Sequence, residues 1–192
     1  MSLQHAILGF LSSKPMSGYD LKKIFDQSVR HFWPANQSQI YRELSRLTEN
    51  GLVQQEVIQR EDRLDKKLYH ITAAGRDELH QWISTPLPPQ DYRDPALIQV
   101  HFGSRMNDEE LIALLKHELT GLEEARNQFA AMYEMYQRLL AQQQGRSDLF
   151  FSILTLEYGI LTNQATLKWV RSMLERLESG VYDPLSYDEL TI

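Results

Sequence analysis

Two long stretches of apolar residues at helical spacing, both in the C-terminal half, restrict the fold more than any other feature. One stripe begins after Asn107 and continues toward Gln144 with hardly a break. A single helix over this range would be roughly 55 Å long, and a small domain accommodates such a helix when another packs along it. We expect residues 148–179 to form that second helix, after a turn at residues 142–147, and the tail from Gly180 to be extended. The first stripe consists of Leu111, Leu115, Leu119, Leu122, Phe129, Met132, Tyr136 and Leu139.

The predicted second helix is apolar on two sides, and a helix with two apolar faces must bury both. One face carries Phe151, Leu154, Tyr158, Leu161 and Ala165, and the other carries Ile153, Leu156, Ile160, Leu167, Val170 and Leu174. We predict that one face packs on the preceding helix and the other on a second copy of the chain. Residues 95–192 would then form an antiparallel helical hairpin, or coiled coil, that makes a homodimer. The residues assigned to dimerisation are Leu115, Leu119, Leu122, Phe129, Tyr158, Leu161, Leu167, Val170 and Leu174.

The N-terminal half contains a shorter amphipathic stretch, residues 37–52. Ile40, Leu44 and Leu47 recur at steps of four and three, which places them on one side of a helix. The opposite face combines amides, hydroxyls and cations, which match the donors and acceptors of base edges and phosphates. A polar helix face taken alone is more often simply solvated, so the neighbouring segments must decide. This face carries Gln37, Gln39, Tyr41, Arg42, Ser45 and Arg46.

The neighbouring segments predict a winged helix-turn-helix over residues 1–85. A buried helix at residues 3–11 precedes a helix capped by Ser17, with Asp20 three residues on, which we expect to reach about His31. After the third helix, apolar runs on either side of a charged segment predict a β-hairpin. Thr72 caps a fourth helix, in which we expect Leu79, Trp82 and Ile83 to pack inward. Residues 86–94 are rich in proline and are expected to be a linker. The fold is therefore predicted to be mainly α.

Charge is distributed unevenly along the chain. The net charge of −6 argues at first against a nucleic-acid partner, but residues 1–85 carry 11 Lys+Arg against 10 Asp+Glu, while residues 86–192 carry 9 against 16. A nearly neutral N-terminal half can still present a local basic face. The chain has no cysteine, so disulfides and thiolate chemistry are excluded. The N-terminal segment resembles neither a signal peptide nor a membrane span, and we expect a cytoplasmic protein.

Catalytic and metal-binding patterns are weak in this sequence. The histidines His70, His80, His101 and His117 lack the short ligand spacings of zinc sites. Adjacent glutamates such as Glu109 and Glu110 diverge on a helix, whereas paired carboxylate catalysis needs convergent groups. We therefore predict no catalytic residue, no metal site and no cofactor.

DNA binding can be described with specific residues. The start of the recognition helix usually enters the major groove, so Gln37, Ser38, Gln39 and Arg42 are predicted to contact bases. Tyr41 and Arg46 are predicted to contact phosphates, although the ring of Tyr41 could instead serve the core. The predicted wing carries Arg60, Arg63, Lys66 and Lys67, for which a solvated loop is the alternative.

Four spaced motifs in the first 85 residues resemble the PadR family of bacterial transcriptional regulators, and specifically its longer, AphA-like members. The motifs are Leu3-x-x-Ala6-Ile7-Leu8-Gly9-x-Leu11; Ser17-Gly18-Tyr19-Asp20-Leu21; Ile40-Tyr41-x-x-Leu44-x-x-Leu47-x-x-x-Gly51-Leu52-Val53; and Tyr69-x-Ile71-Thr72-x-x-Gly75-Arg76-x-Glu78-Leu79-x-x-Trp82. The wing departs from the family, because residues 63–67 lack the Gly-Arg or Arg-Pro element that often precedes the basic residues. The resemblance implies a winged-helix regulator that dimerises through C-terminal helices.

We therefore expect a homodimeric transcriptional regulator, predicted to be a repressor, that binds a pseudo-palindromic DNA operator. The alternative is a protein-interaction adaptor that uses the winged domain and the helical arm without DNA. Some family members resemble sensors of aromatic compounds, so a small aromatic effector is a further candidate partner. Its candidate site, for which ordinary packing of a hinge is the alternative, consists of Phe32, Trp33, Tyr92, Arg93 and His101.

Overall fold

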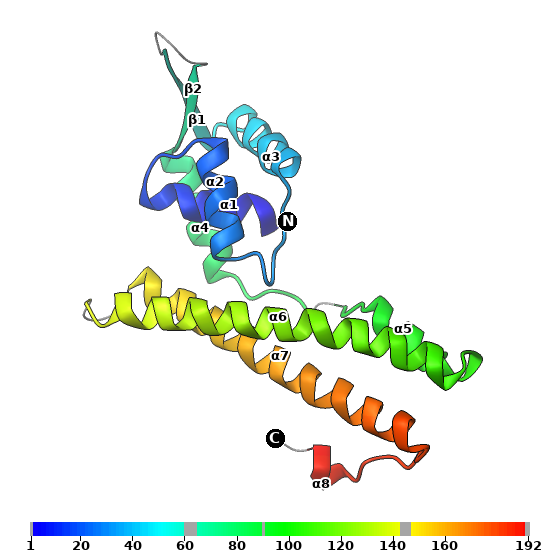
Figure 1. The fold of residues 1–192 in the computed structure, drawn as a ribbon. Helices are drawn as coiled ribbons and strands as arrows, with labels where there is room; N and C mark the ends of the chain where they lie inside the picture. The colour runs from blue at the N-terminus through cyan, green and yellow to red at the C-terminus, as the bar shows by residue number, and fades with distance from the viewer. Residues whose placement is uncertain (1, 60–64, 90, 143–146, 191–192) are drawn as a thin grey trace. The chain divides into compact units, whose positions relative to one another are not determined.

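A computed structural model describes residues 2–59, 65–89, 91–142 and 147–190. The chain divides into two compact units, Met1–Gln90 and Asp91–Ile192, and each is described separately (Figure 1). The elements of the first unit are α1 (Ser2–Ser13), α2 (Gly18–Gln27), α3 (Gln37–Glu49), β1 (Val53–Ile58), β2 (Lys66–Ile71) and α4 (Ala73–Ser84). Those of the second are α5 (Pro95–His101), the 3-10 turn η1 (Gly103–Arg105), α6 (Asp108–Leu140), α7 (Asp148–Ser179) and α8 (Tyr187–Leu190).

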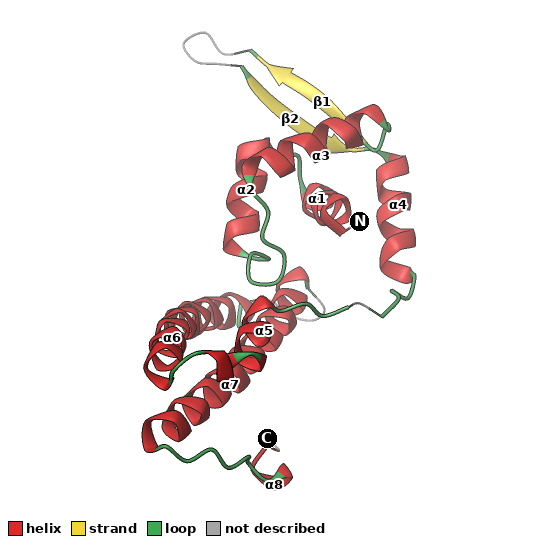
Figure 2. Ribbon diagram, turned by 90° about the vertical axis from the view of Figure 1, so that its right-hand side faces the viewer, coloured by secondary structure: helices red, strands yellow, loops and turns green. Residues whose placement is uncertain are grey.

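The first unit is the predicted winged helix, with α1 surrounded by α2, α3 and α4 (Figure 2). The stripe on α3 is fully buried, with Ile40 and Leu44 at 0% exposure and Leu47 at 1%. It joins a core formed by α1, α2 and the start of the hairpin. This burial confirms the predicted inner face of α3, and it leaves the opposite face of the helix outside.

Helix ends in this unit follow the expected capping chemistry, with one exception. Ser17 and Asp20 form the predicted capping box at the start of α2. Gly51 follows α3 with φ of 70°, the left-handed conformation expected after a helix C-terminus. The prediction that α2 reaches His31 was wrong. The helix ends at Gln27, because the backbone N–H groups of the next three residues all turn back to the carbonyl of Phe25.

The hairpin is antiparallel, with a register that pairs Val53 with Ile71 and Ile58 with Lys66. Its second strand is also attached to the rest of the unit. Met16 and Tyr69 exchange two backbone hydrogen bonds of 3.3 and 2.9 Å, which join β2 to the segment before α2. The wing is therefore held from the side as well as from its base.

The fourth helix packs against the first. His5 of α1 is buried, stacks on Trp82 of α4 with 4.4 Å between ring centroids, and places Nε2 3.1 Å from a carboxylate oxygen of Glu78. Leu79 packs against the core as predicted. Ile83 does not, since 66% of its surface is exposed. The α4 side that meets α1 is set by Leu79 and Trp82, and Ile83 lies outside it.

The second unit is the predicted antiparallel hairpin of long helices, α6 and α7. Val170 and Leu174 of α7 pack with Leu115 of α6 in a buried cluster. Ion pairs cross the same contact, with Arg171 2.6 Å from Glu123 and Lys116 2.7 Å from Glu178. The tail, predicted to be extended, contains the short helix α8. Among the described helices, none combines the length and apolarity needed to cross a membrane.

One buried polar residue lies in this helix contact. Asn163 of α7 is 7% exposed, and its side-chain amide donates a 3.2 Å hydrogen bond to the backbone carbonyl of Leu122 in α6. Its Oδ1 atom is buried, and no donor among the described residues reaches it. A buried acceptor without a donor lowers stability, and a single polar residue between apolar helices favours one register.

Replacing Asn163 with leucine should raise the free energy of unfolding by about 1 kcal/mol, because the unsatisfied oxygen disappears while the volume stays similar. Urea denaturation followed by circular dichroism measures the change. The matched control is Asn127→Leu at an exposed position of α6, which should stay within about 0.5 kcal/mol of the wild type. A less stable Asn163→Leu protein would mean that Oδ1 finds a donor in solution.

Candidate nucleic-acid interface

The outer face of α3 is polar and exposed. Gln37, Ser38, Arg42 and Arg46 are all exposed, and Tyr41 is 39% exposed. They lie opposite the buried stripe of the same helix, so the core contact that fixes α3 also directs these side chains outward. This face supplies amide, hydroxyl and guanidinium groups of the kinds that bind bases and phosphates.

Gln39 has a structural role in addition to the predicted contact with bases. It is half-buried at the start of α3, where its side-chain oxygen accepts a 2.8 Å hydrogen bond from the backbone N–H of Asn36. The Asn36 side chain in turn accepts a 2.9 Å hydrogen bond from the backbone N–H of Gln39. This capping box occupies the amide oxygen of Gln39, and its NH₂ group remains as the donor for a contact. The spacing of Asn36 and Gln39 was the sequence signal for this role.

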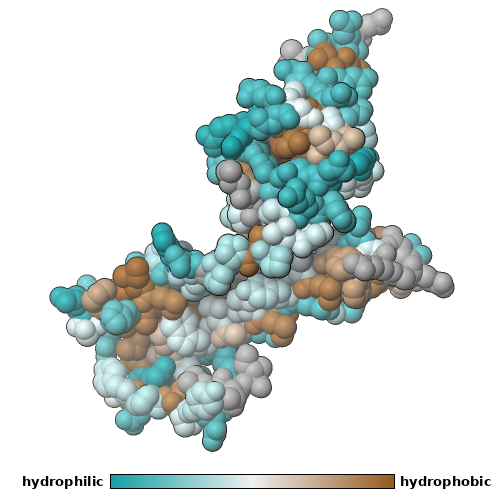
Figure 3. Space-filling view, turned by 180° about the vertical axis from the view of Figure 1, so that it is seen from behind, coloured by the Kyte–Doolittle hydropathy of each residue, from teal (hydrophilic) through white to brown (hydrophobic). Residues whose placement is uncertain are grey.

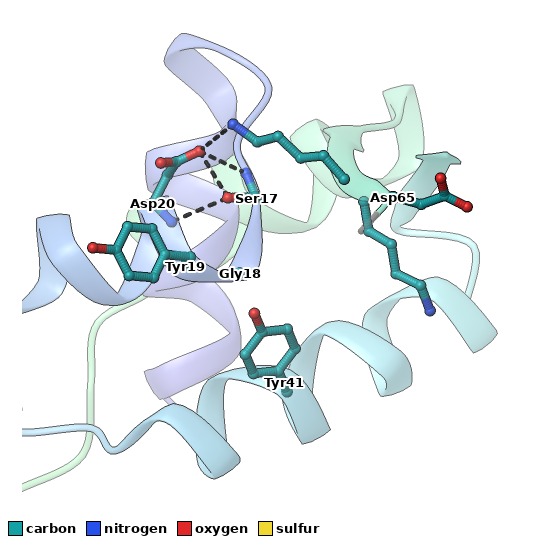
Figure 4. A pocket seen from close by; sticks show the side chains of 8 residues that line it. Ser17, Gly18, Tyr19, Asp20, Tyr41 and Asp65 are labelled. Carbon is teal, nitrogen blue, oxygen red and sulfur yellow. Dashed lines mark hydrogen bonds and ion pairs between the residues drawn. The ribbon is translucent and has the colours of Figure 1, made fainter. Parts of the chain in front are cut away.

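A recess lies beside α3, where the first turn of α2 meets the start of strand β2 (Figure 4). Its volume is about 400 Å³. We call it the α2 recess; it is lined by Ser17, Gly18, Tyr19, Asp20, Tyr41, Asp65, Lys66 and Lys67. Three segments distant in sequence therefore meet at one place on the first unit. Two of them, α3 and the wing, carry the residues predicted to bind DNA.

Tyr41 reaches the recess because Gly18 has no side chain. A Cβ atom built on Gly18 would lie 2.5 Å from Cε1 of Tyr41 and 2.6 Å from its Cζ, far inside van der Waals contact. The tyrosine ring thus lies directly against the first turn of α2. Sequence reasoning matched the Ser17-Gly18-Tyr19-Asp20 motif and predicted the capping box, but it gave Gly18 no part in the site.

Asp20 is the centre of a polar cluster in the same recess. Its Oδ2 atom accepts hydrogen bonds from the Ser17 hydroxyl at 2.7 Å and from the Lys66 ammonium at 3.0 Å, and a longer one from the Ser17 backbone N–H at 3.4 Å. The Ser17 hydroxyl and the Lys66 ammonium hold the pKa of Asp20 below its usual value, because both stabilise the charged carboxylate. The carboxylate therefore stays ionised at neutral pH.

The described part of the wing is less basic than the sequence suggested. Lys66 and Lys67 lie in strand β2 rather than in the connecting loop. Asp20 pairs with Lys66, Asp65 lies beside the two lysines in the recess, and Glu56 is 2.8 Å from His70 across the hairpin. The other two predicted wing residues, Arg60 and Arg63, lie outside the described residues.

Family models match both units. Residues 7–81 match the transcriptional regulator PadR-like family, and residues 92–178 match the virulence activator alpha C-terminal family. The chain belongs to the PadR-like family of transcriptional regulators. Because this is a family of regulators rather than enzymes, the expectation of a non-enzymatic protein is confirmed.

Known PadR-like proteins resemble this chain over almost its full length. The negative transcriptional regulator PadR of Bacillus subtilis is 29% identical over 177 residues, which cover 92% of this chain and 97% of that protein. Its crystal structure with operator DNA matches with a TM-score of 0.80 at 28% identity, over 92% of this chain and 99% of that one. Its complex with p-coumaric acid matches with a TM-score of 0.70 at 28% identity, over 92% and 95%.

A second relative represents the longer members of the PadR-like family. The Vibrio cholerae virulence activator AphA matches with a TM-score of 0.74 at 28% identity, over 93% of this chain and 99% of that one. The resemblance to AphA-like members inferred from the motifs is therefore confirmed, and it extends over both units.

Most residues assigned to dimerisation in this PadR-like chain pack inside one copy of it. Leu115, Leu167, Val170 and Leu174 are at most 6% exposed. Leu115 of α6 packs with Val170 and Leu174 of α7 in one cluster of the same chain. Leu119 and Leu122 pack against the same cluster, and Phe129 is half-buried. Tyr158 and Leu161 differ, with 68% and 63% of their surface exposed. They lie on the other apolar face of α7.

The residues proposed for an aromatic ligand fall into both units. Phe32 and Trp33, 45% and 36% exposed, line a hollow of about 440 Å³ in the first unit, together with Leu3, Pro34, Ala35 and Gln39. In the second unit the Tyr92 hydroxyl donates a 3.1 Å hydrogen bond to Asp94, Arg93 pairs with Asp91, and His101 lies against Phe102. Among the described residues, no group of three potential ligands is placed to hold a metal ion.

Replacing Gly18 with alanine should lower the free energy of unfolding by about 1 to 3 kcal/mol, because the new methyl group overlaps the Tyr41 ring. Gly9→Ala is the matched control, since a Cβ atom at that position of α1 meets nothing within 4 Å. The control should stabilise the unit by up to about 1 kcal/mol through helix propensity. Urea denaturation of both variants tests this, and equal stabilities would exclude a tight contact between Gly18 and Tyr41.

Proposed function

We propose that this PadR-like protein is a repressor that binds a pseudo-palindromic operator as a homodimer, with α3 in the major groove. The observation that carries the proposal is the exposed polar face of α3, directed outward by a completely buried apolar stripe. Arg42 and Gln37 lie near the helix start, where they can donate to base edges, and Tyr41 lies beside them. The operator complex of Bacillus subtilis PadR supports this assignment.

The wing and the residues around it would bind phosphates. Lys67 is exposed on β2, and Arg46 is exposed in the last turn of α3. Arg60 and Arg63 remain part of this proposal on the basis of the sequence alone. Because the whole chain has a net charge of −6, binding would depend on these local cations and would weaken steeply with salt. Binding to a chromosomal operator would place the protein in the cytoplasm.

Dimerisation is proposed through the second apolar face of α7. This face is exposed in the single chain: Leu154 is 43%, Tyr158 68% and Leu161 63% exposed. Near the same end of the hairpin, Leu139 of α6 and Phe150 of α7 are 45% and 40% exposed. Figure 3 shows apolar side chains gathered in patches on the surface of the second unit. A second copy of the same chain can bury this apolar face against its own, in an interface with twofold symmetry.

A small aromatic acid is the proposed effector class. The hollow lined by Phe32 and Trp33 offers aromatic contact area, and Gln39 provides a polar group at its edge. The complex of Bacillus subtilis PadR with p-coumaric acid supports this class of ligand. A thermal-shift screen with phenolic acids tests it, and silence across the series would argue against an effector of this kind.

The central test is electrophoretic mobility shift with duplexes that the wild-type protein selects from a random-sequence library. Arg42→Ala should weaken binding by about 1 to 3 kcal/mol and relax the sequence preference at one position, if Arg42 contacts a base. Arg105→Ala removes an exposed arginine of the second unit and is the control, with no change expected. No selected duplex, even at low salt, would favour the alternative of a protein-binding adaptor.

Dimerisation has its own test. The double variant Leu154→Glu/Leu161→Glu should convert the protein to a monomer, because it buries two carboxylates in the proposed interface. Gln164→Glu adds a charge to an exposed position of α7 away from this face, and it should leave the dimer intact. Sedimentation equilibrium of the three proteins decides, and a monomeric wild type would refute the interface.

A further inference from the structure

We propose that the first turn of α2 is a platform that holds the wing at a fixed angle to α3, with Asp20 as the positioning residue for the wing. This inference rests on the proposed DNA binding, for which α3 and the wing must meet one duplex together. The platform consists of residues 16–20. It contacts both DNA-binding elements, although it belongs to neither.

The contact with α3 is made by Gly18 and Tyr41. The tyrosine ring lies so close to the glycine that a single methyl group would overlap it. Tyr41 lies one residue after the buried Ile40, so the position of its ring is tied to the core stripe of α3. The platform therefore has a defined position relative to the recognition helix.

The contacts with the wing are made at two points along β2. Met16 exchanges backbone hydrogen bonds with Tyr69, and Asp20 holds the Lys66 ammonium at 3.0 Å. Tyr69 and Lys66 are three residues apart in the strand, which corresponds to about 10 Å. A strand attached at one point can pivot, whereas attachment at two separated points fixes its angle. The Asp20 contact is the one nearer the wing tip. It therefore restricts the angle of the wing more strongly than a contact of equal strength at the base would.

The charges of the α2 recess favour positioning over direct phosphate binding by Lys66. The side chains of Lys66 and Asp20 are 32% and 43% exposed, and they neutralise one another. Asp65 and Lys67 also line the recess. The Asp20 carboxylate also accepts both Ser17 donors, which orients it toward β2. Lys66 therefore binds the platform through Asp20. Lys67, which is exposed on β2, is the lysine that we expect to contact phosphate.

Asp20→Asn is the first variant for the test, because an amide oxygen can still accept from Ser17 while the charge that holds Lys66 is lost. Asp26→Asn is the matched control, since Asp26 forms an ion pair with Lys22 within α2 itself. Asp20→Asn should lose about tenfold in affinity for the selected duplex, equivalent to about 1.4 kcal/mol. Its affinity for a random duplex should change by less than about twofold, and Asp26→Asn should match the wild type for both duplexes.

Variants of Lys66 separate positioning from phosphate binding. Lys66→Arg keeps a donor for Asp20 and should bind like the wild type. Lys66→Gln should match Asp20→Asn, and the double variant should lose no more than either single one, because both remove the same contact. The positioning role of Asp20 is refuted if Asp20→Asn binds both duplexes more tightly and with a steeper salt dependence. Lys66 would then be a phosphate ligand that the ion pair with Asp20 keeps from the DNA.

A measurement without DNA keeps this inference distinct from the proposed function. The chain has no cysteine, so spin labels can be attached at Lys23→Cys on α2 and Val57→Cys on the wing, both exposed positions. The distribution of distances between the labels should broaden in Asp20→Asn and stay narrow in Asp26→Asn. Equal widths would overturn the platform. If the distances broaden in Asp20→Asn but the wild-type protein binds no DNA, the platform is supported and the proposed function is rejected.

Discussion

The arrangement of the first unit depends on the burial of Ile40, Leu44 and Leu47 against α1 and α2. These three side chains fix the rotation of α3 about its own axis, since any other rotation would expose them to water. The outward direction of Arg42 and its neighbours is a consequence of that burial rather than of any contact they make themselves. Specificity toward a base sequence therefore depends on packing on the opposite side of the helix.

Much of this architecture was predictable because it depends on local spacing. The inner stripe of α3, the Ser17–Asp20 capping box and the long helices α6 and α7 all follow from residues within one or two turns of each other. Ile83 was misassigned because periodicity identifies an apolar side chain but not the side from which a neighbouring helix approaches. The end of α2 at Gln27 escaped prediction because it depends on turns that converge on one carbonyl.

The candidate site was predictable in part. The outer face of α3 followed from the stripe, whereas the contacts of Gly18 with Tyr41 and of Asp20 with Lys66 join segments 23 and 46 residues apart. Sequence spacing holds no information about such pairs. The same limit applies to α7, where two apolar faces were recognised. The face containing Val170 packs on α6 of the same chain, whereas the face containing Tyr158 is exposed. Periodicity alone could not tell which of the two faces packs on α6.

The backbone bridge between Met16 and Tyr69 has a consequence for solubility. A two-stranded sheet has two open edges, and open edges are templates for pairing with strands of other molecules. Tyr69 already uses its outward N–H and C=O groups on Met16, so this edge of β2 is closed near its middle. A short segment outside the sheet thus protects a small wing from intermolecular strand pairing, at the point where the wing joins the body of its unit.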